Sequence, residues 1–262
     1  MNRWVLIGIV AILLVFAGVA TTFVLPLSVD STGGPFELGQ SESYVSSGKI
    51  STDEVGLLIA HEATVLADDD AHLTFEYENR TVEQFYDDGT VYTKYEGHVD
   101  DEEWMASTEP TDVEEVYFGE HEDRFVRITT ENGTVDSSSS HMLFVRMETR
   151  HLLSVPAYER VNEQGDRTGY APSSTWTKME SGTMRATPES GELSVDTETG
   201  VLREASLRYQ LTEASSYGEY LLRPGNTTTV NVQYEYDPGP SVDDIETPAW
   251  VEQCVENDHC EF

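Results

Sequence analysis

Basic residues are scarce in this chain of 262 residues. Lysine and arginine together number 15 against 49 aspartates and glutamates, which gives a net charge of −34, and the only lysines are Lys49, Lys94 and Lys178. Binding to DNA or RNA depends on basic side chains that neutralise phosphates, and nothing in the sequence resembles a basic patch. The charge balance therefore disfavours binding to nucleic acid, and we expect no nucleic acid as a partner.

Cysteine is almost absent as well, because the chain has only Cys254 and Cys260. No cysteine comes directly after the apolar N-terminal segment, which excludes anchoring through a lipid-attachment cysteine. In an exterior compartment two cysteines this close favour a disulfide, so we expect residues 251–262 to form a tail with a small disulfide loop. A metal clip that adds His259 is the alternative, but it offers too few ligands.

Recognisable catalytic and cofactor-binding motifs are also lacking. The sequence contains no G-x-S-x-G pattern, phosphate-binding loop or dinucleotide fingerprint, and its seven histidines do not show the spacing of a zinc helix. Asp68–Asp70 and Asp100–Glu103 offer oxygen ligands for Ca²⁺, but in so acidic a chain we interpret them as solvated surface. We expect no enzyme activity, no catalytic residue, no metal and no cofactor.

Carboxylates are what the chain has in excess, and they are spread along it from Asp30 to Glu261. In dilute buffer such a surface repels itself, whereas at molar salt the Debye length falls to about 3 Å and the repulsion is screened. This composition favours a protein of a halophile. The alternative is an acidic domain that docks a basic partner, but that would predict the acids in one block.

One long apolar run begins the chain. Residues 4–29 contain no charged side chain, and about 20 apolar residues suffice to cross a bilayer core of about 30 Å. We expect residues 1–29 to form a transmembrane anchor or uncleaved signal, with a cleaved signal peptide as the alternative. Arg3 precedes the run and acids follow it, which predicts a single-pass protein of the cell membrane with a cytoplasmic N-terminus and an extracellular C-terminal domain.

The extracellular domain is expected over residues 41–250, after a linker over residues 30–40. It contains three N-x-[ST] sequons, at Asn79, Asn132 and Asn226, which are candidate glycosylation sites. Sequons also occur by chance, so they agree with an exterior placement without establishing it.

Two helices are predicted in this domain. The first runs from Ser51 to Leu66, because Ser51 and Glu54 have the spacing of a capping box and apolar residues follow at a 3.6-residue period. The second covers Met142 to Leu153, whose apolar residues share one helical face, and Pro156 ends it.

Alternating apolar and polar residues predict strands over most of the remaining domain. Asp88-Gly89 and Asn132-Gly133 predict hairpins, and residues 196–200 predict a further turn. The expected strands are residues 73–78, 82–86, 91–95, 104–107, 116–118, 125–130, 168–178, 183–187, 191–196, 201–211 and 228–236. Together the elements predict an α+β fold, in which an N-terminal transmembrane helix precedes a curved antiparallel β-sheet, a half-barrel, with helices on its concave side.

The order of these elements resembles a known group of proteins. The hairpin at Phe85–Tyr92, the strand and turn at Gly191–Gly200 and the segment Thr247–Trp250 carry the resemblance, which is to haloarchaeal envelope proteins of unknown function similar to the LolA-like and LppX-like half-barrel lipoprotein carriers. In those carriers the sheet and its helices enclose an apolar cavity for acyl chains. The resemblance implies that this domain binds a lipid or another hydrophobic ligand.

Aromatic residues on the predicted strands are the candidates for lining such a cavity, although strands favour tyrosine for ordinary core packing too. The candidates are Phe75, Tyr77, Tyr92, Tyr95, Tyr209, Tyr234 and Tyr236. The expected partners are the membrane, through the N-terminal helix, a lipid or other hydrophobic ligand, and envelope proteins. The alternative function is a non-enzymatic structural or protein-interaction component of the cell envelope.

Overall fold

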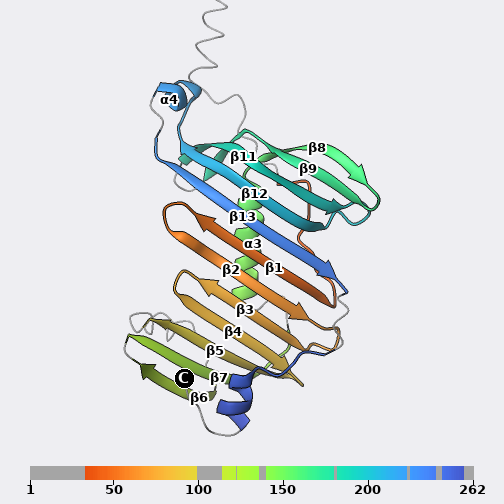
Figure 1. Ribbon diagram of the computed structural model, residues 1–262, viewed down its shortest axis with the longest axis vertical. Helices are drawn as coiled ribbons and strands as arrows, with labels where there is room; N and C mark the ends of the chain where they lie inside the picture. The colour runs from red at the N-terminus through yellow and green to blue at the C-terminus, as the bar shows by residue number, and fades with distance from the viewer. Residues whose placement is uncertain are drawn as a thin grey trace, which may run out of the picture.

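The computed structural model describes residues 33–98, 114–121, 123–135, 140–179, 182–222, 225–239 and 244–256. The dominant feature of these residues is a single antiparallel sheet of 13 strands (Figure 1). Strands make up 62% of the structure and helices 13%.

The elements follow one another as two runs of strands around one long helix. The first run is β1 (Tyr44–Thr52), β2 (Gly56–Val65), β3 (Ala71–Tyr77), β4 (Arg80–Asp87), β5 (Thr90–His98), β6 (Glu114–His121) and β7 (Arg124–Asn132). The helix is α3 (Ser140–Leu153). The second run is β8 (Ala157–Gln164), β9 (Arg167–Ser173), β10 (Thr175–Met179), β11 (Gly182–Asp196), β12 (Leu202–Glu213), the short helix α4 (Tyr217–Leu222) and β13 (Thr227–Pro238), followed by α5 (Ala249–Val251) and η2 (Glu252–Glu256).

The two runs of strands meet at the centre of the sheet. The order across it is β6-β7-β5-β4-β3-β2-β1-β13-β12-β11-β9-β8, and β10 pairs with one end of β11. Since β1 pairs with β13, the first and last strands of the chain lie side by side (Figure 1). Side chains alternate between the two faces of a strand, so this single register decides which residues of both runs share a face.

Two predicted turns are confirmed. Asp88 and Gly89 both have positive φ, 43° and 77°, and they join β4 to β5 as a two-residue turn. After β11, the Asp196 carboxylate accepts hydrogen bonds from two following backbone N–H groups and from the Arg203 guanidinium, and Gly200 has a φ of 71°. Local turn chemistry therefore fixes both connections.

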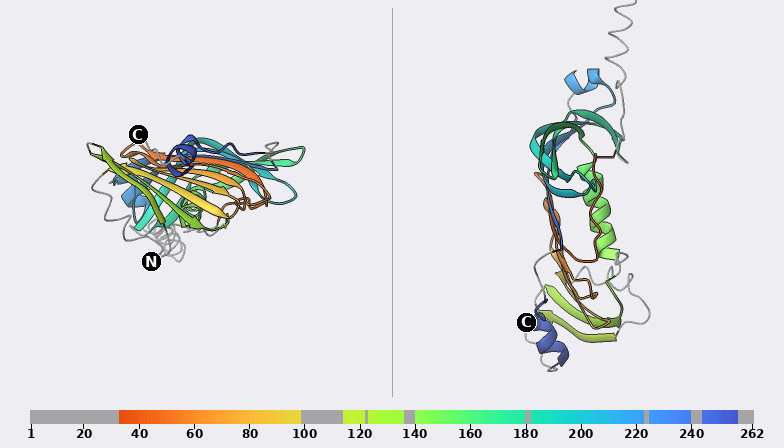
Figure 2. Two further views of the ribbon diagram at one scale, coloured as in Figure 1. Left: turned by 90° about the horizontal axis from the view of Figure 1, so that it is seen from below. Right: turned by 90° about the vertical axis from the view of Figure 1, so that its right-hand side faces the viewer.

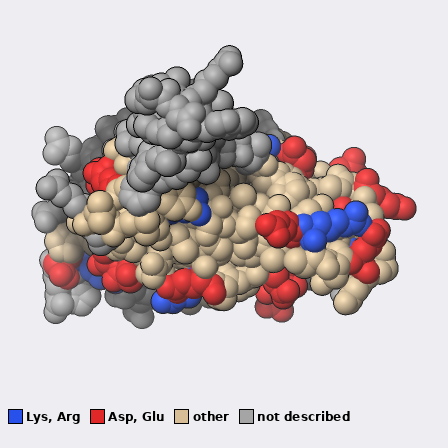
Figure 3. Space-filling view, turned by 90° about the horizontal axis from the view of Figure 1, so that it is seen from above, with Lys and Arg blue, Asp and Glu red and all other residues tan. Residues whose placement is uncertain are grey.

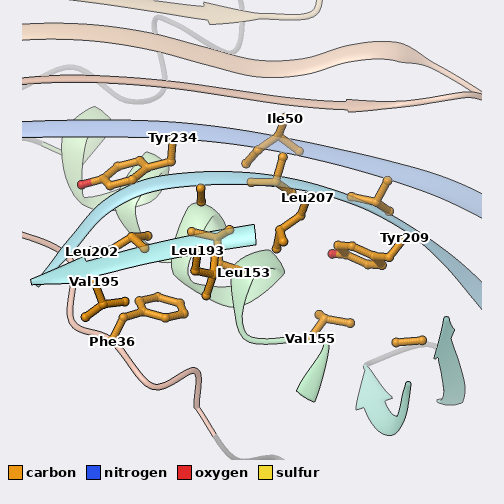
Figure 4. Close-up of a cluster of buried hydrophobic side chains, with 14 of the residues drawn as sticks. Phe36, Ile50, Leu153, Val155, Leu193, Val195, Leu202, Leu207, Tyr209 and Tyr234 are labelled. Carbon is orange, nitrogen blue, oxygen red and sulfur yellow. The ribbon is translucent and has the colours of Figure 1, made fainter. Parts of the chain in front are cut away.

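The helix α3 packs along one face of the sheet, which we call the helix face (Figure 2). This is the second predicted helix, and the prediction is confirmed. Its residues Met142, Val145 and Leu153 are buried, in contact with two hydrophobic clusters of the sheet. Figure 4 shows side chains from β1, β11, β12 and β13 gathered around Leu153. Burial of this apolar seam is what holds the helix on the sheet.

The other face of the sheet, the opposite face, is covered at one end by the C-terminal segment. There α5 and η2 place Trp250, Val251 and Cys254 against Phe85 of β4 and Ile128 of β7. All five side chains are less than a tenth exposed. The C-terminal segment therefore closes an apolar patch that the strands leave on their otherwise more polar side.

The first predicted helix, Ser51 to Leu66, is wrong. Its residues end β1, turn, and then form β2. Ile59, Ala63 and Val65 are all buried on the helix face, which is the two-residue period of a strand. Because β2 pairs with both β1 and β3, tertiary pairing outweighs the local helical signal.

The predicted α+β class is contradicted too, because the described residues are mostly antiparallel sheet. The prediction of a half-barrel with helices on its concave side is therefore not retained. Among the described residues α3, with 14 residues, is the one long helix, and α4 has only 6. The hairpin predicted at Asn132-Gly133 is also wrong, since the chain leaves the sheet after β7 and continues to α3. The strand expected over 104–107 lies outside the described residues.

The expected transmembrane anchor, residues 1–29, lies outside the described residues. None of the helices that the structure describes is long and apolar enough to cross a bilayer. This finding contradicts the predicted placement as a single-pass protein of the cell membrane. The predictions of a cytoplasmic N-terminus and an extracellular C-terminal domain depended on that anchor, so we do not keep these predictions.

Candidate functional site

A hollow of about 360 Å³ lies on the helix face at the end of α3, and we call it the apolar hollow. Its apolar lining side chains are Leu58, Leu152, Met179, Met184, Leu211 and Val230. Its polar lining side chains are Thr52, Glu54, Glu213, Asn226 and Thr228. Five segments that are distant in the sequence therefore meet around one space.

Strands β12 and β13 supply the deepest side chains of the apolar hollow. Leu211 and Val230 are 8% and 3% exposed. In the register of these strands Leu211 lies opposite Thr228, and Val230 lies opposite Tyr209. All four side chains thus project from the helix face, where alternation along the strands puts the apolar residues.

The last turn of α3 supplies Leu152. The Tyr209 hydroxyl donates a hydrogen bond to the Leu152 carbonyl oxygen at 2.9 Å, and the Tyr158 hydroxyl donates to the Leu153 carbonyl oxygen. These phenols belong to β12 and β8, so they tie the end of the helix to the sheet. Burial raises the pKa of both tyrosines above the ordinary value, so both keep the proton that they donate.

The hairpin of β10 and β11 supplies two methionines. In its register Met184 lies opposite Thr177, and Met179 lies opposite Gly182. Both methionines are partly buried against the cluster around Leu153. Methionine is unbranched and polarisable, so it adapts to ligands of different shape better than leucine or valine does.

The rim of the apolar hollow is polar and acidic. Glu54, Glu213 and Asn226 are exposed, and among the described residues that line the hollow there is no lysine or arginine. Apolar walls with a few polar groups at the edge are typical of sites for small apolar or amphiphilic molecules.

The structure does not bring the seven predicted cavity-lining aromatics together. Phe75, Tyr209, Tyr234 and Tyr236 are buried in the core, none more than 6% exposed. Tyr92 lies on the opposite face, stacked on Phe85.

Tyr77 and Tyr95 lie at the other end of α3. Both rings pack against the His141 ring in the first turn of the helix. None of the seven predicted aromatics is among the residues that line the apolar hollow.

The residues that do line the hollow were not visible as a group in the sequence. Leu152 was predicted on the apolar side of a helix, and Leu211 and Val230 lay on predicted strands, but each pattern is also that of ordinary core. Met179 and Met184 carry no motif; a pair of methionines across a short hairpin was the only available signal.

The opposite face carries a larger but different depression. An open trough of about 570 Å³ crosses the central strands, and the charged side chains that line it are Lys49, Glu62, Glu76, Glu204 and Glu235. Seen along the long axis of the molecule, acidic side chains are scattered among other residues rather than gathered in one patch (Figure 3). We interpret this trough as hydrated acidic surface.

The remaining predicted sites fall at separate places. Asn79, Asn132 and Asn226 are all exposed, and Asn226 lies on the rim of the apolar hollow. Cys254 is buried and disulfide-bonded, whereas Cys260 lies outside the described residues. Within the part of the chain that the structure describes, no three His, Cys, Asp or Glu side chains are grouped so as to hold a metal ion.

Comparison with known proteins finds no relative of this chain. No known protein family, curated protein or solved structure matches the chain. The resemblance to the lipoprotein carriers therefore stays a prediction.

Proposed function

We propose that this protein binds a small ligand through an aliphatic chain, which occupies the apolar hollow. The observation that carries the proposal is the hollow itself, about 360 Å³ bounded by six apolar side chains and edged by polar ones. Burial of apolar surface supplies the binding free energy, about 0.8 kcal/mol for each methylene group. The polar rim leaves the ligand's head group in water.

The size of the hollow restricts the ligand. Pockets for small molecules span about 300–1,000 Å³, and this hollow lies near the lower limit. It suits one short aliphatic chain and is too small for several long acyl chains.

Beneath the middle of α3, side chains leave little space between the helix and the sheet. Phe75, Val145 and Leu153 are wholly buried there, and the cavity beneath the middle of α3 measures about 10 Å³. That is about the space that one water molecule needs. An aliphatic chain therefore fits at the end of α3 and not beneath its middle.

Titration calorimetry with a series of straight-chain alcohols, from butanol to dodecanol, tests the proposal in molar sodium chloride. Each added methylene should tighten binding about fourfold, the equivalent of about 0.8 kcal/mol, until the hollow is full. Beyond that length the affinity should level off, which distinguishes a bounded site from adsorption to an apolar surface.

Substitutions on the two faces of the sheet sharpen the test. Met184→Trp fills the hollow and should weaken binding of the best alcohol at least tenfold. Ser206→Trp puts the same ring at an exposed position of the opposite face and should leave the affinity unchanged. Equal affinities in the two variants would contradict the proposal. Absence of binding to the wild-type protein would favour the alternative, a structural or interaction component without a ligand.

A further inference from the structure

The rim of the apolar hollow carries negative charge. Glu54, in the turn between β1 and β2, and Glu213, the last residue of β12, both line the hollow and are both exposed. Among the described residues, neither carboxylate has a partner in an ion pair, and none of those that line the hollow is a lysine or arginine. An apolar space is thus edged by two carboxylates whose charge no described side chain neutralises.

The turn that carries Glu54 is fastened to β13. The Asp53 backbone N–H donates a hydrogen bond to the Thr229 carbonyl oxygen at 3.2 Å, and the Thr229 N–H donates to the Asp53 carboxylate at 2.8 Å. The hydrogen bond from Thr229 lowers the pKa of Asp53, so this neighbour of Glu54 is also ionised at neutral pH. These two bonds fix the turn, and with it Glu54, next to the part of β13 that lines the hollow.

Glu213 lies beside one of the two methionines of the hollow. In the register of β11 and β12 it is opposite Met184, and residues opposite each other on antiparallel strands have Cβ atoms about 5 Å apart. The Glu213 backbone N–H donates a hydrogen bond to the Asn226 carbonyl oxygen at 3.2 Å, so Asn226 is held at the same edge. A carboxylate and a side-chain amide are therefore placed where an aliphatic chain that packs on Met184 meets water.

The chemistry of the rim selects among head groups. Ionised carboxylates only accept hydrogen bonds, and the Asn226 side chain accepts through its oxygen. A protonated primary amine has three N–H donors for such acceptors, whereas a carboxylate head group would be repelled. Quaternary ammonium groups are recognised by aromatic faces, and no aromatic side chain is among the described residues that line the hollow. The rim therefore fits a primary ammonium group best.

We infer that the ligand of the apolar hollow is a primary alkylamine in its protonated form. This inference rests on the proposed function, because the aliphatic chain occupies the hollow while the ammonium group contacts Glu54 and Glu213. Alkyl ammonium groups such as that of lysine have a pKa of about 10.4, so the head group is charged at neutral pH. Screening in molar salt acts beyond about 3 Å, which leaves direct contact between the charges in place.

Titration calorimetry of the full-length protein at pH 7 in molar sodium chloride compares head groups on one octyl chain. Octylamine should bind about tenfold more tightly than octanoate, with octanol between them. Octyltrimethylammonium has the same charge without N–H donors and should bind about threefold more weakly than octylamine. If octanol bound but octylamine bound no more tightly than octanoate or octyltrimethylammonium, the inference would be overturned and the proposed function would stand. If none of these compounds bound, both would be overturned.

Substitution of the carboxylates assigns the effect to the rim. Glu213→Gln should lower the ratio of octylamine affinity to octanol affinity about twofold, and adding Glu54→Gln should bring the ratio close to one. The octanol affinity of each variant serves as its own reference for changes in the hollow. Glu204→Gln is the matched control, because Glu204 is an exposed carboxylate of the same strand that lines the trough on the opposite face. Equal ratios in Glu213→Gln and Glu204→Gln would overturn the inference.

Discussion

Residues of the central strands point alternately to the two faces of the sheet, yet one face buries apolar side chains and the other exposes polar and charged ones. On β3, Phe75 is wholly buried on the helix face, whereas its neighbours Thr74 and Glu76 line the open trough of the opposite face. The helix face carries α3, the core and the apolar hollow. The opposite face carries the open trough on its central strands and the C-terminal segment at one end.

This difference shows where a binding site can arise in a single-layer sheet. The helix α3 covers the sheet only along its own length, and its last turn stops beside strands whose side chains are still apolar. The apolar hollow is the part of the helix face that the helix does not fill. The opposite face, with carboxylates along its trough, offers no comparable apolar surface at its centre.

The largest expected effect comes from neighbouring positions on β3 that point to the two faces. Phe75→Ala removes a wholly buried ring and leaves a cavity, which should lower the free energy of unfolding by about 4 kcal/mol. Thr74→Ala, on the opposite face, should change it by less than about 0.5 kcal/mol. Chemical unfolding in molar salt measures both.

If Phe75→Ala and Thr74→Ala lowered the free energy of unfolding by similar amounts, the two faces would not differ as described. In that case the open trough would have to be covered in the protein, and Thr74 would belong to a second core.

A smaller effect is expected from acid, again on the helix face. The pKa of His61 is lowered to about 4, first by burial and then by the charge of Arg146. Below about pH 6.5 His61 therefore binds a proton in the unfolded chain, whereas in the folded protein it stays neutral until the pH approaches 4. Stability should therefore fall as the pH falls from about 6.5 to about 4, by about 3 kcal/mol at most. Unfolding curves at a series of pH values measure this slope.

His61→Gln should flatten that part of the pH profile. His151→Gln, at an exposed position on α3, controls for the loss of one imidazole. If the wild-type protein and His61→Gln lost stability in parallel between pH 6.5 and 4, His61 would not be the buried neutral group that the structure describes.

Elements with local signals could be predicted from the sequence. The Asp88-Gly89 turn, the helix that ends before Pro156 and the alternation of β13 each depend on residues close together in the chain, and the structure has all three. The segment from Ser51 to Leu66 failed because its apolar residues fit a helical period as well as a strand period. Pairing with β1 and β3, which no local pattern shows, decided the outcome.

The candidate site could not be predicted for a related reason. Leu58, Leu152 and Met184 become neighbours only because β1 pairs with β13, and α3 then crosses the seam. Strand aromatics such as Tyr209 and Tyr234 were a reasonable expectation for a cavity lining, but the sheet packs them under the helix as core. Composition and alternation identify an apolar face without showing where that face stays uncovered.

Nuclear magnetic resonance of the methionine methyl groups tests the proposed binding site most directly. In protein labelled with ¹³C at these methyls, decanol should shift the signals of Met179 and Met184, which line the apolar hollow. Met142 lies in the first turn of α3, at the other end of the helix, and is buried against the sheet, so its signal should not shift. A shift of Met142 as large as those of Met179 and Met184, or no shift of any of the three at saturating decanol, would contradict the assignment of this hollow as the ligand site.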